Sequence, residues 1–201
     1  MTPAEALLQE LGITEPEEID LETIAYHVGA RVRFRPLCGC EAHILGCGGH
    51  AIITVKHDSS ARRKRFSIAH ELGHWRFHRG KTLVCRVDEY RPRDAQSPEK
   101  AADGYAADLL MPRYLFAPRA SALGRIAFDS IGRVAEAFKT SLSVTVLVTQ
   151  ARASFPRRYA LGGAVALLCI AYVTARTSEM VDASTSTSRS SRNATSASIF
   201  G

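Results

Sequence analysis

The feature that most constrains this chain is an H-E-x-x-H pattern formed by His70, Glu71 and His74. In an α-helix, residues i and i+4 lie on the same face one turn apart, so the two imidazoles can bind one metal ion, and Glu71 lies beside that face. Zinc suits this set, because it accepts two neutral imidazoles and a carboxylate and leaves a fourth position for water. Such water loses its proton near neutral pH, and Glu71 can carry that proton to a leaving amine. The pattern therefore predicts zinc-dependent amide hydrolysis with Glu71 as the catalytic base.

The residues around the pattern favour a helix. A basic run at 62–65 comes first, and a proline-free turn follows with the apolar residues Phe66, Ile68, Ala69 and Leu72. An alternative stays open in which the two histidines lie on this helix without binding a metal.

The third ligand is predicted on the next helix. Pro98 suits the first turn of a helix, and apolar residues recur from there to a stop at Pro112. Glu99 in that first turn could reach the metal from the side opposite the histidines. Asp103, one turn later on the same face, could accept the second N–H of a ligand imidazole and so orient its ring. The alternative for Glu99 is a solvated acid that the helix dipole favours.

Other metal-binding residue types lie close in sequence but form weaker patterns. A second, structural zinc site could in principle involve Cys38, Cys40, Cys47 and His50, but their spacing matches no common zinc finger, so loop thiols are the favoured interpretation. His78, one turn beyond the active-site pattern, could line the cleft or serve as a hydrogen-bonded residue near the helix end. We assign His78 no catalytic role.

Hydrophobic periodicity predicts the α+β class. Two short amphipathic helices are expected first, then a small antiparallel sheet, then the active-site helices of a zincin-like metallopeptidase core. The predicted strands cover Val32 and Phe34, residues 42–45 and residues 51–55. The predicted division is a metallopeptidase domain at 1–118, a helical, helix-turn-helix-like segment at 119–155, an apolar segment at 156–176 and a disordered Ser/Thr-rich tail at 177–201.

The helix-turn-helix-like segment does not look suited to reading DNA. An apolar stripe runs from Ile131 to Phe138, and the second helix, at 144–153, has almost no Arg, Asn or Gln for contacts to bases. The formal net charge is +6, but the basic residues are scattered along the chain. We therefore expect packing or substrate docking here, and no direct contact with nucleic acid.

The two ends of the chain bear on its location. The first ten residues carry acids and no basic or long apolar region, which indicates no secretory signal, so a cytoplasmic protein with five reduced cysteines is expected. Leu161 to Ala175 is a nearly uncharged run of 15 residues, whereas a membrane span needs about 20. A buried strand or helix is therefore favoured over a membrane segment, and no membrane partner is expected.

The motifs at 65–74 and 99–112 together resemble those of the ImmA/IrrE family of bacterial metallopeptidases, which pairs R-F-x-x-A-H-E-L-G-H with E-x-x-A-x-x-F-A-x-x-L-L-M-P. The resemblance covers roughly residues 19–150, and Tyr105 stands where phenylalanine is usual. It implies one Zn²⁺ ion on His70, His74 and Glu99, with Glu71 as catalytic base. Mn²⁺ could occupy the same ligands.

The resemblance also implies a biological role. Members of the family cleave a helix-turn-helix transcriptional repressor and so release stress-response or mobile-element genes. A substrate peptide is expected to lie along the sheet edge near residues 42–55, where backbone pairing would hold it. The alternative hypothesis is a non-proteolytic metal-binding regulator that binds a repressor or DNA.

Overall fold

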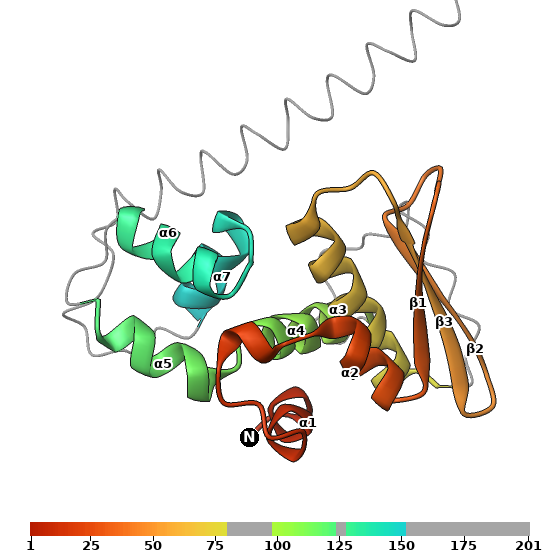
Figure 1. Ribbon diagram of the computed structural model, residues 1–201, viewed down its shortest axis with the longest axis horizontal. Helices are drawn as coiled ribbons and strands as arrows, with labels where there is room; N and C mark the ends of the chain where they lie inside the picture. The colour runs from red at the N-terminus through yellow and green to blue at the C-terminus, as the bar shows by residue number, and fades with distance from the viewer. Residues whose placement is uncertain (80–97, 124–127, 152–201) are drawn as a thin grey trace, which may run out of the picture. The chain divides into compact units, whose positions relative to one another are not determined.

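A computed structural model describes residues 1–79, 98–123 and 128–151 of the 201-residue chain. Ten helices and strands and one 3-10 turn follow one another in these ranges: α1 (Pro3–Glu10), η1 (Pro16–Glu18), α2 (Leu21–His27), β1 (Ala30–Arg35), β2 (Ala42–Cys47), β3 (His50–Lys56), α3 (Ala61–Phe77), α4 (Pro98–Leu110), α5 (Arg113–Ser121), α6 (Phe128–Ala137) and α7 (Leu142–Ala151). Helices and one small sheet together confirm the α+β class (Figure 1).

The helices begin where local side chains can cap them. The Thr2 side chain accepts from the Glu5 backbone, and the Glu5 carboxylate accepts in return from the Thr2 backbone, which forms a capping box at α1. Asp20 caps α2 through the amides of Glu22 and Thr23. Ser60 caps α3 in the same way. The two short N-terminal helices that the periodicity predicts are therefore present.

The sheet is mixed, and the prediction of an antiparallel sheet is wrong for β1. The strand order is β1-β3-β2, with β2 antiparallel to β3 and β1 parallel to it. Gly29 accounts for this arrangement, since its φ of 84° turns the chain out of α2 and a side chain there would lie 2.6 Å from the carbonyl oxygen of Gly49. This close approach places the start of β1 beside the start of β3. Side chains alternate identically in parallel and antiparallel strands, so periodicity could not distinguish the two.

Helix α3 is held between the sheet and α4. In Figure 1, α2 and α3 lie on the same side of the three strands. The inward face of the sheet is apolar: Ala42, Ala51, Ile53 and Val55 are buried. Trp75 of α3 lies against Gly46, and its indole N–H donates to the carbonyl of Val28 at 2.8 Å. These contacts fix the helix that carries the H-E-x-x-H pattern.

The residues that link α6 and α7 contact α5 and Met111, the residue that follows α4. The predicted apolar stripe of α6 is buried at Ile131, Val134, Ala135 and Phe138, and the ring of Phe138 lies 6.3 Å from that of Phe116. The helix-turn-helix role of α6 and α7 stays a prediction. The predicted domain boundary at 118/119 falls within α5 and also stays a prediction.

The predicted segments at 156–176 and 177–201 lie outside the described residues. None of the helices in the described ranges has the length and apolar character that a membrane span requires.

Candidate metal centre

Helix α3 presents two histidines one turn apart on the face that meets α4. The ring Nε2 atoms of His70 and His74 lie 3.1 Å apart. His74 is only 1% exposed, whereas the His70 side chain is 16% exposed. Burial, with the nearby His70 as a second cause, lowers the pKa of His74. The imidazole is therefore neutral near pH 7, which is the form that binds a metal ion.

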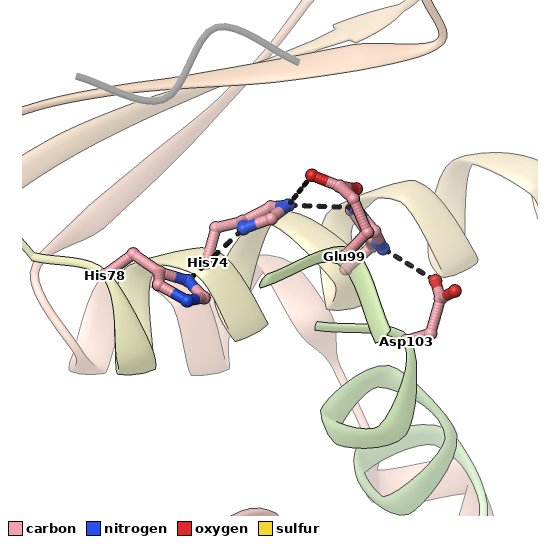
Figure 2. A network of polar contacts seen from close by, with 5 residues as sticks. His74, His78, Glu99 and Asp103 are labelled. Atoms are coloured by element: carbon pink, nitrogen blue, oxygen red, sulfur yellow. Dashed lines mark hydrogen bonds and ion pairs between the residues drawn. The ribbon is translucent and has the colours of Figure 1, made fainter. Parts of the chain in front are cut away.

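Glu99 of α4 completes a cluster of three ligand atoms (Figure 2). Its Oε2 lies 3.1 Å from Nε2 of His70, and its Oε1 lies 3.3 Å from Nε2 of His74. A tetrahedral ion with ligands at about 2.0–2.1 Å holds neighbouring ligand atoms about 3.3 Å apart. The two histidines and the glutamate therefore fit the type and spacing of three zinc ligands.

Each histidine also has a partner on its other ring nitrogen. The Nδ1 atom of His70 donates to the Asp103 carboxylate at 2.9 Å, because the carboxylate can only accept. That bond places the proton on Nδ1 and leaves the lone pair of Nε2 facing Glu99. Nδ1 of His74 lies 3.4 Å from Nδ1 of His78. In the sequence, His78 is marked by its i+4 spacing from His74. An ordinary histidine near the end of the helix would have the same spacing, so the sequence does not distinguish the two.

Glu71 is the buried acid beside this cluster. It is 2% exposed, and its Oε2 atom makes no hydrogen bond to any described residue. Burial raises the pKa of Glu71 to about 7; the charge of His70 opposes the rise, and Glu99 adds to it. A carboxyl group whose pKa lies near neutrality and whose oxygen is available as an acceptor can take and return a proton in this site.

Comparison with family models matches residues 23–147 to the IrrE N-terminal-like domain of the M78 peptidases. The chain belongs to the M78 peptidase family. The match covers more than half of the chain and includes both helices of the cluster, so the resemblance that the paired motifs indicate is confirmed. No curated protein matches the chain.

In this M78 domain, a glycine that the sequence motifs do not single out as functional sets the distance between the two helices. A methyl group on Gly73 would lie 2.7 Å from Cα of Ala102 and 2.9 Å from the carbonyl oxygen of Ala102. Only a residue without Cβ allows α3 and α4 to approach so closely, and this approach brings Glu99 to the histidines. Gly73 lies inside the H-E-x-x-H pattern, so its position was visible, but its contact depends on a helix 29 residues away in sequence.

The second candidate metal site in the sequence does not form. Among the residues that the structure describes, the only group of metal-ligand side chains close enough to share an ion is His70, His74 and Glu99. Cys38 and Cys47 are exposed free thiols, and Cys40 is half-buried. The favoured interpretation as loop thiols holds for Cys38 and Cys40, whereas Cys47 is the last residue of β2 and pairs with His50 of β3.

Proposed function

We propose that this M78 family member is a zinc-dependent endopeptidase in which His70, His74 and Glu99 hold the ion and Glu71 transfers protons. The convergence of three ligand atoms within 4.8 Å, next to a buried carboxylate, is the observation that carries this proposal. Asp103 supports it as the residue that orients His70. The donor set would accept Zn²⁺, and Mn²⁺ is also compatible with it.

A bound zinc ion would supply a Lewis acid that polarises the scissile carbonyl and makes water acidic near neutral pH. The remaining chemistry belongs to Glu71. Hydrolysis adds the hydroxyl of water to the carbonyl carbon and breaks the C–N bond, so one proton must travel from water to the leaving nitrogen. Oε2 of Glu71 accepts that proton and then donates it to the amine. Burial of the carboxylate keeps its pKa high enough for both steps.

The substrate is best placed along β2. The prediction of a docking edge over residues 42–55 is too broad, because β3 (His50–Lys56) is the central strand and pairs on both sides. Within the described part of the chain, only β3 pairs with β2, so the other edge of β2 is available for backbone hydrogen bonds. An extended peptide added there would be held by main-chain pairing beside α3.

For the substrate itself we propose a helix-turn-helix transcriptional repressor, whose cleavage in the cytoplasm would release stress-response or mobile-element genes. The family supports a protein substrate, and the resemblance described above suggests the repressor. The competing hypothesis is a non-proteolytic metal-binding regulator that forms a complex with the repressor.

The test is cleavage of a purified helix-turn-helix repressor by purified full-length protein with one equivalent of zinc. We expect Glu71→Gln to lower the cleavage rate about 10²–10⁴-fold with zinc stoichiometry unchanged, because it removes only the proton carrier. Glu22→Gln, an exposed glutamate on α2, is the matched control and should cleave normally. Unchanged cleavage by Glu71→Gln refutes the mechanism. A stable complex without cleavage by the unsubstituted protein refutes the peptidase proposal and favours the regulator.

A further inference from the structure

Charge is strongly segregated along the first third of the chain. Residues 1–22 contain seven acidic residues and no basic one, whereas residues 23–65 contain eight basic residues and two acidic ones. The second stretch includes all three strands and the start of α3. Four of the eight basic residues lie on the strands and four at the start of α3, so positive charge is concentrated in this part of the fold.

Three of these basic residues form a row on one face of β1. Arg31, Arg33 and Arg35 alternate with residues that point toward the helices, and all three arginines are exposed. Alternate residues of a strand are about 6.6–6.8 Å apart, so the row is about 13 Å long. Arg33 lies opposite Thr54 of β3, and Thr54 lies opposite His43 of β2. The same outward face thus offers guanidinium, hydroxyl and imidazole groups on adjacent strands.

Within the described residues, the three arginines of β1 are not engaged in ion pairs. Other basic residues nearby do pair: Arg62 with Glu136, Arg63 with Glu41 at 3.5 Å, and Lys56 with Asp58 at 3.9 Å. No carboxylate in the described ranges forms an ion pair with the three arginines of β1. One arginine of the row contacts an aromatic ring: Arg31 lies 6.0 Å from the centre of the Tyr26 ring, which is itself 69% exposed.

We propose that the outward face of the sheet binds the phosphate backbone of duplex DNA through Arg31, Arg33 and Arg35. One strand of B-form DNA carries a phosphate about every 3.4 Å along the helix axis, so a row of arginines about 13 Å long can meet several phosphates. Arginine binds phosphate through two parallel N–H groups, and threonine is also a common phosphate contact. An acidic peptide would match the row only with a carboxylate at every second residue, whereas DNA has a charge at every nucleotide.

This proposal revises the expectation of no direct contact with nucleic acid. That expectation rested on the helix-turn-helix-like segment and on scattered basic residues, and neither concerns the sheet. Backbone contacts would give affinity without sequence preference. The proposal does not depend on peptidase activity, because none of its residues belongs to the metal cluster.

The experiment is fluorescence anisotropy of a labelled 20-base-pair duplex of mixed sequence, titrated with the full-length protein at several salt concentrations. Three phosphate contacts contribute a slope of about −2.7 to the plot of log affinity against log salt, which is about a 40-fold loss between 50 and 200 mM. We expect the triple variant Arg31→Gln, Arg33→Gln, Arg35→Gln to lose this part of the slope. Arg33→Gln alone should lose about one third of it. Circular dichroism checks that both variants are folded.

A matched control separates a defined surface from net charge. Arg113, Arg133 and Lys139 are exposed and lie outside the sheet, and replacing all three by Gln removes the same charge. This control should keep the slope of the unsubstituted protein, and Glu71→Gln should keep it as well. The proposal is overturned by an absence of duplex binding at 50 mM salt or by equal losses in the triple variant and the control. It is also overturned by tighter binding of a labelled polyglutamate, or of single-stranded DNA, than of the duplex.

Discussion

Replacing Gly73 with alanine tests whether close contact between α3 and α4 assembles the metal cluster. The added methyl group would lie 2.7 Å from Cα of Ala102, whereas carbon atoms in contact are about 3.5–4.0 Å apart. The two nearest atoms belong to the backbone of α4 and the third, 3.2 Å away, is Cβ of Ala102, so no side-chain rotation relieves the overlap. The helices must separate by about 1 Å, and Glu99 must move with α4.

The expected energies follow from two opposed effects. Overpacking of this kind costs about 1–3 kcal/mol, and alanine gains about 1 kcal/mol over glycine inside a helix. The matched control is Gly104→Ala on α4, since Gly104 has no atom within 4 Å of the added methyl group. Gly104→Ala gains helix propensity without overpacking, whereas Gly73→Ala has both effects. The free energies of unfolding of the two variants should therefore differ by the overpacking cost of about 1–3 kcal/mol.

The same displacement should weaken metal binding. Metal–ligand distances in a working site hold to about 0.2 Å, so moving Glu99 by about 1 Å should lower zinc affinity at least tenfold. Urea denaturation of the metal-free proteins measures the stability, and competition with a chromophoric chelator measures zinc affinity. If Gly73→Ala is as stable as Gly104→Ala and binds zinc within twofold of the unsubstituted protein, the spacing argument is refuted.

Two further predictions concern the acids of the site. Asp103→Ala should lower zinc affinity about 10–100-fold, because the His70 ring loses the partner that orients it. Asp129→Ala, at an exposed aspartate, is the control. Equal zinc affinities for the two variants would contradict the role of Asp103 in orienting His70. In the metal-free protein, the pKa of Glu71 is raised from 4.5 to about 7, so between these two pH values the folded state holds a proton that the unfolded state has lost. The free energy of unfolding should therefore fall by about 3 kcal/mol as pH rises from 4.5 to about 7. Urea denaturation at pH 4.5 and pH 8 with a chelator should show this fall in the unsubstituted protein and not in Glu71→Gln, and parallel pH dependences would show that burial does not raise this pKa.

The metal cluster was unusually accessible from sequence because its spacing is local. His70, Glu71 and His74 lie within one and a half turns of one helix, so the helical period alone places the imidazoles together. Glu99 required a second helix start at Pro98 and a family resemblance. The structure brings these residues together, and their roles stay proposals that the substitutions above test.

The sheet was harder to predict for a physical reason. Alternation in β1 correctly separates the arginines from the inward-facing residues, but Phe34, expected to point inward, stays 40% exposed and lies under Lys64. Strand direction depends on the contact between Gly29 and Gly49, which are 20 residues apart. Periodicity has no information about such a contact.

Sequence by itself determined the chemistry available to this protein: which side chains could bind a metal, which carboxylate lies beside them, and which family the chain resembles. Only the tertiary structure decided the distances that this chemistry needs. The Gly73–Ala102 contact, the partners of the two histidine rings and the strand order all arise from segments that are distant in the chain, where backbone approach and burial, rather than local periodicity, set the geometry.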